Sequence, residues 1–175
     1  MQPGLVPYWP KDIKGGANCI NAMAETVTTK PAFGDAFPRG QRCIVPVDAF
    51  YEWKKIGASK QPYAIVGADR LPLAMTGLWE RWKDRASGDT VQTFTIITTV
   101  PNELCGAIYD RVPVILSPEK WATWLGERKA DVDELRWLIL RPHPASLMRA
   151  YPVAPSVGNV RNNDASLLDE ISVAA

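Results

Sequence analysis

Arg42-Cys-Ile-Val-Pro-Val-Asp-Ala-Phe-Tyr-Glu-Trp53 is the stretch on which the fold prediction rests. Its apolar and β-branched residues favour a β-strand. Pro46 interrupts the run and cannot donate a hydrogen bond to a neighbouring strand, so it predicts a bulge or the edge of a sheet. We therefore expect one interrupted strand that delivers four consecutive residues, Phe50 to Trp53, at its end.

Glu52 lies among aromatic residues at the end of this predicted strand. Side chains of an extended chain alternate, so Phe50 and Glu52 share one face while Tyr51 and Trp53 share the other. A carboxyl that has lost part of its water there has a raised pKa, which suits proton transfer near neutral pH. These four residues by themselves are more typical of a surface strand that ends in a solvated glutamate.

The composition predicts one ordinary soluble domain. The chain has 175 residues, of which 46% are hydrophobic and 22% charged, and it has no apolar run long enough to cross a bilayer. Its formal charge of +1 excludes a strongly basic nucleic-acid binder. A local groove lined by arginines stays compatible with that charge.

The cysteines and the single histidine limit the possible chemistry. Cys19, Cys43 and Cys105 are odd in number and widely spaced, and the first residues lack a secretory signal, so we expect reduced thiols and a cytoplasmic protein. His143 lies between two prolines, and the sequence has no Cys-x-x-Cys pair, no His-x-x-x-His pair and no Gly-rich phosphate loop. We therefore expect no metal and no cofactor.

The remaining segments predict an α+β class. Short strands dominate the middle of the chain and helices dominate its last third, which favours a curved and largely antiparallel sheet. Ser117-Pro118-Glu119 is a good helix start, with a capping hydroxyl and proline in the first turn. Strands are expected at 60–66, 71–82, 91–99 and 108–116, and helices at 29–37, 101–107, from 117, at 131–140 and from 144.

Several ordered motifs resemble those of the SRAP family, the SOS response-associated peptidases. The motifs are Gly4-Leu-Val-Pro-x-Trp, Asn21-Ala-x-Ala-Glu-Thr, Arg42-Cys-Ile-Val-Pro, Phe50-Tyr-Glu-Trp, Lys60-Gln-Pro-Tyr, Gly77-Leu-Trp-Glu and Asp110-Arg-x-Pro-Val-Ile-Leu. The resemblance runs from Gly4 to about Leu168. It implies a single SRAP domain over residues 1–175, with a barrel-like antiparallel core and peripheral helices.

The resemblance also implies a function. Members of the family bind single-stranded DNA and link covalently to abasic sites, through an N-terminal cysteine whose amine and thiol close on the sugar aldehyde as a thiazolidine. Glu52 would transfer protons and assist self-processing by peptidase activity. Asn21 would orient the cysteine amine or the sugar, and Thr98 would line the site. We expect a monomer whose partner is single-stranded DNA with abasic sites.

Aromatic and basic residues complete the expected site. Trp53 and Trp9 offer faces on which unpaired bases stack. Arg42, Arg111 and Arg161 are candidates for phosphate contacts, with a solvated surface charge or a structural ion pair as the equal alternative for each.

Three departures from the family pattern affect the expected activity. The family's cysteine precedes the Gly-Leu-Val-Pro motif by several tens of residues, whereas three residues precede Gly4 here. We therefore expect a chain truncated at its N-terminus relative to the family. Tyr109 stands where the family has a histidine, and a phenol with a pKa of ~10 cannot shuttle protons at pH 7 as imidazole does. Met23 replaces a basic residue, so a non-catalytic single-strand DNA-binding module is the alternative function.

Overall fold

The computed structural model describes residues 1–173, and its chain forms two compact units. Unit 1 comprises Met1–Val45, Ala74–Val100 and Pro113–Pro142. Unit 2 comprises Pro46–Leu73, Pro101–Val112 and the chain from His143 onward. A single domain over the whole chain stays a prediction from the sequence.

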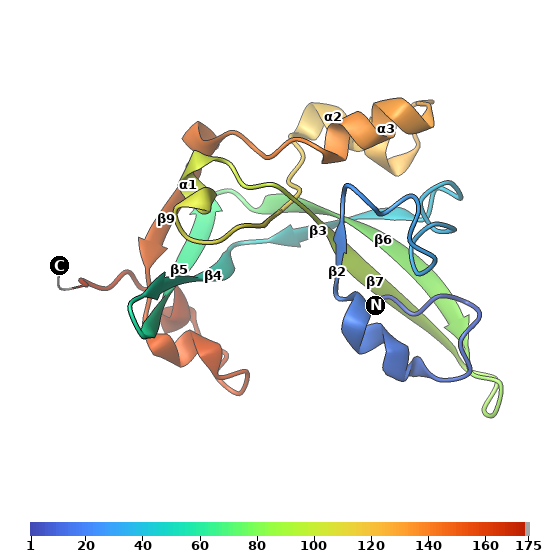
Figure 1. Ribbon diagram of the computed structural model, residues 1–175, viewed down its shortest axis with the longest axis horizontal. Coiled ribbons are helices and arrows are strands. Elements are labelled where there is room, and N and C mark those ends of the chain that lie inside the picture. The colour runs from blue at the N-terminus through green and yellow to red at the C-terminus, as the bar shows by residue number, and fades with distance from the viewer. Residues whose placement is uncertain (174–175) are drawn as a thin grey trace. The chain divides into compact units, whose positions relative to one another are not determined.

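Residues 1–173 form nine strands, of which β2 to β7 follow one another without a helix between them, and short helices that lie mostly in the last part of the chain (Figure 1). The strands are β1 (Gln2–Pro3), β2 (Asn21–Met23), β3 (Arg42–Val47), β4 (Phe50–Ile56), β5 (Ser59–Gly67), β6 (Leu73–Lys83), β7 (Thr90–Thr99), β8 (Val112–Pro113) and β9 (Met148–Pro152). The helices are α1 (Glu103–Gly106), α2 (Pro118–Leu125) and α3 (Val132–Ile139). The 3-10 helices are η1 (Ile13–Cys19), η2 (Ala145–Leu147), η3 (Pro155–Gly158) and η4 (Ala165–Leu168).

The strands form two sheets, and their pairing confirms the α+β class with mainly antiparallel strands. One sheet has the order β1-β7-β6-β3, with β2 and β8 also paired to β7. The short strands β1 and β2 are parallel to β7, while the long strand β6 is antiparallel to it. The other sheet, β4-β5-β9, is antiparallel throughout. Neither sheet closes within residues 1–173, so the barrel-like core implied by the family resemblance is not confirmed.

The stretch from Arg42 to Trp53 is not one strand, which corrects the prediction from the sequence. It forms β3 and β4, which belong to different sheets and are separated by Asp48 and Ala49. The predicted effect of Pro46 is confirmed, because β3 lies at the edge of its sheet. The apolar pattern is continuous across the break although the two strands are at most partly buried, so the sequence carries no local sign of the change of sheet.

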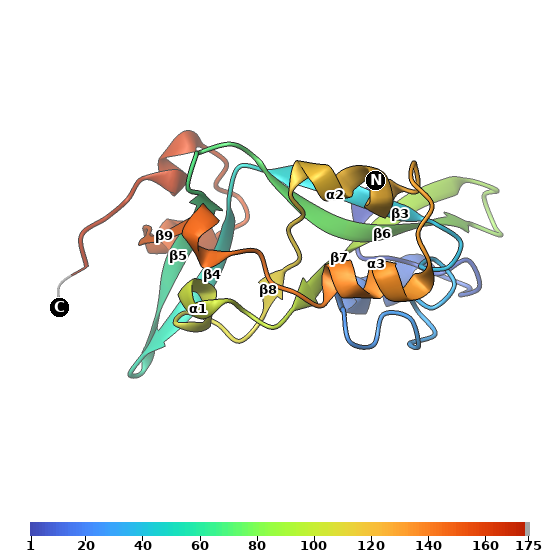
Figure 2. The same cartoon turned by 90° about the horizontal axis from the view of Figure 1, so that it is seen from above.

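Unit 1 has a large apolar core between its sheet and the helices α2 and α3. Trp124 and Phe37 meet edge to face at its centre, with ring centroids 6.0 Å apart. The helices lie side by side along the sheet (Figure 2). Helix α2 begins at Ser117 and Pro118 as predicted, but the Ser117 hydroxyl donates to the Glu119 carboxylate and makes no capping bond to the backbone. Gly126 ends the helix with a φ of 85° that glycine adopts without strain.

The segment from Thr29 to Phe37 is a series of turns, so the helix predicted there is wrong. Phe33 and Gly34 both donate backbone hydrogen bonds to Lys30, but no continuous helix follows. Gly34 weakens a helix interior. Phe33 and Phe37 both insert into the core, which holds the turns in place without helical propensity.

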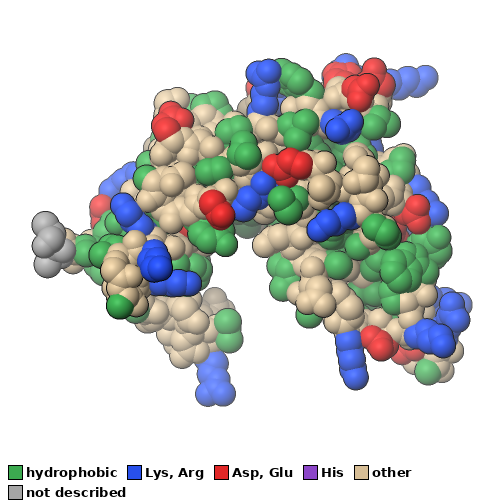
Figure 3. All heavy atoms as spheres, viewed as in Figure 1, with side chains coloured by type: hydrophobic (Ala, Val, Ile, Leu, Met, Phe, Trp, Pro, Cys, Tyr) green, Lys and Arg blue, Asp and Glu red, His purple; other side chains and the backbone are tan. Residues whose placement is uncertain are grey.

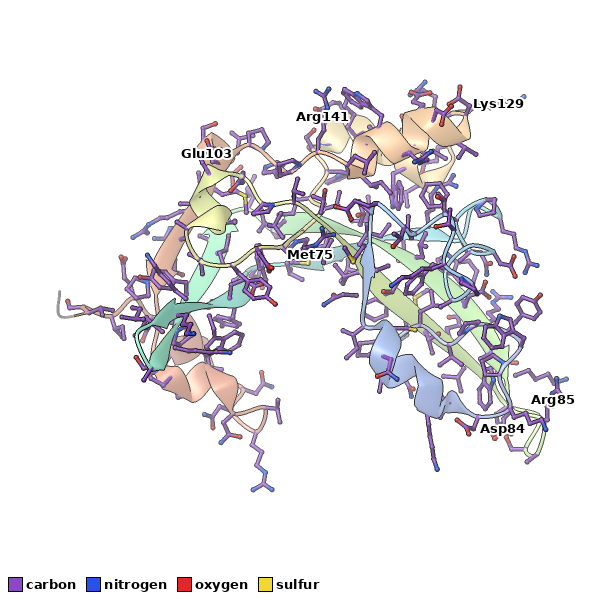
Figure 4. The ribbon with its side chains drawn as sticks, viewed as in Figure 1. Met75, Asp84, Arg85, Glu103, Lys129 and Arg141 are labelled. Atoms are coloured by element: carbon purple, nitrogen blue, oxygen red, sulfur yellow. The ribbon has the colours of Figure 1, made fainter. Side chains whose placement is uncertain are left out.

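Unit 2 is built around the β4–β5 hairpin and β9. Its smaller core contains Ala64, Val66, Tyr151 and Val153. Helix α1 begins after the buried Asn102, whose side-chain Oδ1 accepts from the Cys105 backbone N–H and whose Nδ2 donates to the carbonyl of His143 at 2.7 Å. The first residue of α1, Glu103, is marked in Figure 4.

The described part of the chain contains no helix with the length and apolar character to span a membrane.

Candidate functional site

Glu52 has the most informative electrostatics among the predicted site residues. It lies in β4 opposite Tyr63 of β5 and is partly buried. Burial, as the larger cause, and the negative charge of Asp110 together raise the pKa of its carboxyl to about 7. The carboxyl is therefore divided between its acid and base forms at neutral pH. This supports the interpretation of a proton-transfer group over that of a solvated strand end.

Asp110 and Cys105 of unit 2 interact electrostatically with Glu52. Cys105 is buried in α1, and burial together with the charge of Glu52 raises the pKa of its thiol to about 11. The thiol is therefore protonated at neutral pH, so it is a poor nucleophile. In the sequence, Asp110 stands out only as part of the Asp110-Arg-x-Pro-Val-Ile-Leu motif. Its effect on Glu52 depends on the fold, because 57 positions separate them in the sequence.

Tyr109, which the family resemblance predicts to replace a histidine, follows the turn at the end of α1. Its backbone N–H donates to the carbonyl of Cys105 at 2.9 Å, and its side chain is 49% exposed. Within unit 2, the pKa of Glu52 matches proton transfer near pH 7.

Asn21, Met23 and Thr98 belong to unit 1. Asn21 and Met23 expose their side chains on β2, while Ala22 between them is buried. Their strand is parallel to β7, with Met23 in register with Thr98, whose hydroxyl donates to the carbonyl of Ala22 at 3.4 Å. Because Asn21 and Glu52 belong to different units, their expected proximity stays a prediction.

Two tryptophans expose ring faces suited to stacking. Trp53 in β4 is 37% exposed and lies opposite Pro62 of β5. Trp9 in unit 1 is 51% exposed. Exposed indole rings are sequence-tolerant platforms for unpaired bases, as expected from the sequence. Both therefore stay candidates for base stacking.

Arg42 has a clear structural role. Its Nε donates to the carbonyl of Trp124 and its Nη1 donates to the carbonyl of Phe37 at 3.2 Å. The guanidinium also lies 5.8 Å from the centroid of the Trp124 ring, and burial lowers its pKa. These contacts leave less of the guanidinium for phosphate than the sequence suggested. This structural role of Arg42 differs from both alternatives that the sequence left open, a solvated surface charge and an ion pair.

Arg161 and Arg111 are placed differently from Arg42. Arg161 is exposed, and its backbone N–H is held by Asn159 Oδ1 at 3.1 Å. Arg111 is partly buried.

Lys and Arg side chains are mixed with acidic ones over the face shown in Figure 3, and no single large basic patch is visible on that face. Residues 1–173 contain no cluster of three or more His, Cys, Asp or Glu side chains that could hold a metal.

The sequence matches the model of the family described as SOS response associated peptidase (SRAP) over residues 1–160. The chain belongs to the SRAP family. The site residues named above, apart from Arg161, lie inside the matched segment. Family membership was predicted from the ordered motifs and is confirmed.

Relatives of this SRAP chain include abasic site processing proteins of two bacteria. It is 44% identical to the abasic site processing protein YoaM of Bacillus subtilis, over 95% of this chain and 72% of that protein. It is 33% identical to the abasic site processing protein YedK of Escherichia coli, over 87% of this chain and 67% of that protein. A crystal structure of a protein from Bacteroides thetaiotaomicron superposes with a TM-score of 0.88 at 30% identity, covering 97% of this chain and 75% of that one.

Proposed function

We propose that this SRAP chain binds single-stranded DNA that contains abasic sites and acts on the sugar aldehyde, with Glu52 as the proton-transfer group. Family membership and relatives named abasic site processing proteins support the substrate class. The observation that carries the chemistry is the pKa of Glu52, raised to about 7 by burial and by Asp110.

Opening of the abasic sugar requires the kind of proton transfer that Glu52 can perform. The hemiacetal hydroxyl loses a proton, the bond between the anomeric carbon and the ring oxygen breaks, and the ring oxygen gains a proton. The product is the open aldehyde. A carboxyl with a pKa near the ambient pH accepts the first proton and donates the second efficiently, and such catalysis is worth about 10²–10⁴-fold.

The thiazolidine step of the family needs an amine and a thiol on adjacent carbons. Cys19, Cys43 and Cys105 are internal, so their nitrogens are amides, and burial raises the pKa of all three thiols. None of these three cysteines is therefore expected to form a thiazolidine. An amine of the protein can still condense with the aldehyde to an imine and water, and borohydride reduces that imine to a stable amine.

Trapping on an abasic oligonucleotide tests this function. Wild type, Glu52→Gln and the matched variant Glu103→Gln are incubated with single-stranded DNA containing one abasic site, with and without borohydride, and resolved by denaturing electrophoresis. We expect a borohydride-dependent adduct that forms at least about tenfold more slowly in Glu52→Gln and at the wild-type rate in Glu103→Gln. Trapping no faster than that of an unrelated protein with similar lysine content would contradict the proposal.

Tyr109 favours a second candidate function, a non-catalytic single-strand DNA-binding module. The family resemblance implies a histidine at this position, and imidazole is the side chain best suited to general acid–base work there. Binding of single-stranded DNA in fluorescence anisotropy, together with no adduct with or without borohydride, would identify this second function.

A further inference from the structure

The β4–β5 hairpin of unit 2 places two lysines directly opposite each other. Its strands are joined by the two-residue turn Gly57–Ala58, in which Gly57 has a φ of 58°. The antiparallel register pairs Lys55 with Lys60, one step from the turn. Directly opposed side chains on one sheet face have Cβ atoms only about 4.5–5.5 Å apart, and like charges in such a pair are destabilising.

The one acidic residue of the β4–β5 hairpin, Glu52, lies on the opposite face from Lys55 and Lys60, so it does not offset this repulsion directly. The segment from Trp53 to Tyr63 contains three lysines, Lys54, Lys55 and Lys60, and no Asp or Glu. None of the three forms an ion pair with any side chain that the structure describes. A charge of +3 on eleven residues contrasts with +1 for the entire chain. The outer part of the hairpin, residues 53–63, therefore carries three positive charges that form no ion pair with the described side chains.

An aromatic platform lies on the same face as the opposed lysines. Because side chains alternate along a strand, Trp53 shares a face with Lys55, and Pro62 shares it with Lys60. Trp53 and Pro62 are themselves a cross-strand pair. One face of the hairpin thus presents an indole that is 37% exposed and, two residues further along, a pair of unneutralised ammonium groups. A stacking ring with nearby cations fits a base and the adjacent phosphates of a single strand.

We propose that the outer part of the β4–β5 hairpin is a phosphate-binding clamp for single-stranded nucleic acid, in which Lys55 and Lys60 together hold the backbone beside a base stacked on Trp53. This inference rests on the proposed function and deepens it, because it names the part of unit 2 that holds the strand. The anion removes the repulsion between the two lysines, so ligand binding and hairpin stability are linked.

The clamp gives two opposite expected effects for one substitution. Lys55→Gln, Lys60→Gln and the double variant are compared with the control Lys83→Gln/Lys129→Gln, which removes two exposed charges of unit 1. Fluorescence anisotropy with a labelled oligothymidylate that has no abasic site should show an affinity about tenfold lower for the double variant. Its slope of log K against log salt should be less steep by about 1.4, from two phosphate contacts at ~0.7 each. The thermal midpoint should rise or stay unchanged.

Charge reversal at one lysine sharpens the test. Lys60→Glu places opposite charges across the strand pair, so it should raise the thermal midpoint and weaken DNA binding more than Lys60→Gln does. Competition with inorganic polyphosphate separates a general polyanion site from one that needs bases. A nucleic-acid clamp predicts that oligothymidylate competes better than polyphosphate at equal phosphate concentration.

The outcomes separate the two proposals. If wild type binds no single-stranded DNA, the proposed function itself fails. If wild type binds but the double variant keeps the wild-type salt slope, or the unit 1 control loses as much affinity, the clamp is wrong and the proposed function stands. A fall in thermal midpoint for both Lys55→Gln and Lys60→Gln would show a structural role and also overturn the clamp. Better competition by polyphosphate would exclude base stacking on Trp53.

Discussion

At the scale of single residues, Glu52 links the candidate chemistry to stability. Its pKa is raised from 4.5 to about 7, so the folded chain holds a proton that the unfolded chain has already lost by pH 6. Between about pH 4.5 and pH 7 the folded state therefore binds more protons than the unfolded state. By linkage, the stability of the fold decreases as the pH rises through this window.

Glu52→Gln should therefore stabilise the chain at high pH. The free energy of unfolding of wild type should fall by roughly 1–3 kcal/mol relative to the variant between pH 5 and pH 8, from 1.36 kcal/mol per pKa unit reduced for partial exposure. Denaturant titrations of both proteins at pH 5, 6, 7 and 8 measure this difference. A constant difference across that range would show that Glu52 is ionised as in water. Glu103→Gln, at an exposed position in α1, is the control.

At the scale of secondary structure elements, Arg42 joins β3 to the end of α2. Its hydrogen bond to the Trp124 carbonyl serves one of the last backbone carbonyls of that helix, which have no partner inside the helix. A second bond reaches the carbonyl of Phe37 in the turn segment before β3. One guanidinium thus holds three segments of unit 1 together.

Arg42→Lys should lower the free energy of unfolding by about 1–3 kcal/mol, since an ammonium cannot reproduce the fork of donors. Arg39→Lys is the control, because the Arg39 side chain makes an exposed pair with Asp35 at 4.0 Å and a ring contact with Tyr8, and a lysine keeps its charge. Chemical denaturation of both variants measures the effect. Loss of DNA affinity without loss of stability in Arg42→Lys would favour the phosphate contact that the sequence suggested.

Gly77 lets β6 approach its neighbours closely. A Cβ at this position would lie 2.6 Å from the carbonyl oxygen of Thr95 and 3.0 Å from Cys43 Sγ. Gly77→Ala should therefore destabilise the chain by about 1–3 kcal/mol, whereas Gly15→Ala, with open space around its Cβ, should change the stability little. Thermal unfolding followed by circular dichroism compares the two. Equal midpoints would mean that the strands separate without cost.

At the scale of the whole molecule, the near-neutral charge limits how tightly DNA can bind. A net charge of +1 provides little long-range attraction, so affinity depends on a few lysines and arginines and on stacking. The long β6–β7 hairpin shows this mixture of charges at its tip, where Asp84 and Arg85 are adjacent (Figure 4). We therefore expect weak binding that is sensitive to salt.

Anisotropy titrations with a short single strand measure this sensitivity. About three phosphate contacts predict a dissociation constant that rises roughly 10- to 60-fold between 50 and 200 mM salt. Single strands should bind more tightly than a duplex of the same length, because stacked bases of a duplex offer no free faces. Equal affinity for both forms would contradict the stacking role of Trp53 and Trp9.

The sequence by itself determined the family, the mixed α+β class and most of the strands and helices. These features depend on local patterns: alternation predicts strands, and a capping residue followed by proline predicts the start of α2. Glu52 was identifiable as a candidate acid through the family resemblance, since its aromatic neighbours by themselves favoured a solvated glutamate. Local patterns did not predict the turns at Thr29–Phe37, where burial of two phenylalanines outweighs helical propensity.

Only the tertiary structure decided the break between β3 and β4, the structural bonds of Arg42, the effect of Asp110 on Glu52 and the opposition of Lys55 to Lys60. Each depends on which distant segments meet in space, or on the register of two strands. A shift of one residue in the β4–β5 register would move every side chain to the other face while leaving the sequence unchanged. Charge and burial act through distances in space, and a linear pattern does not contain those distances.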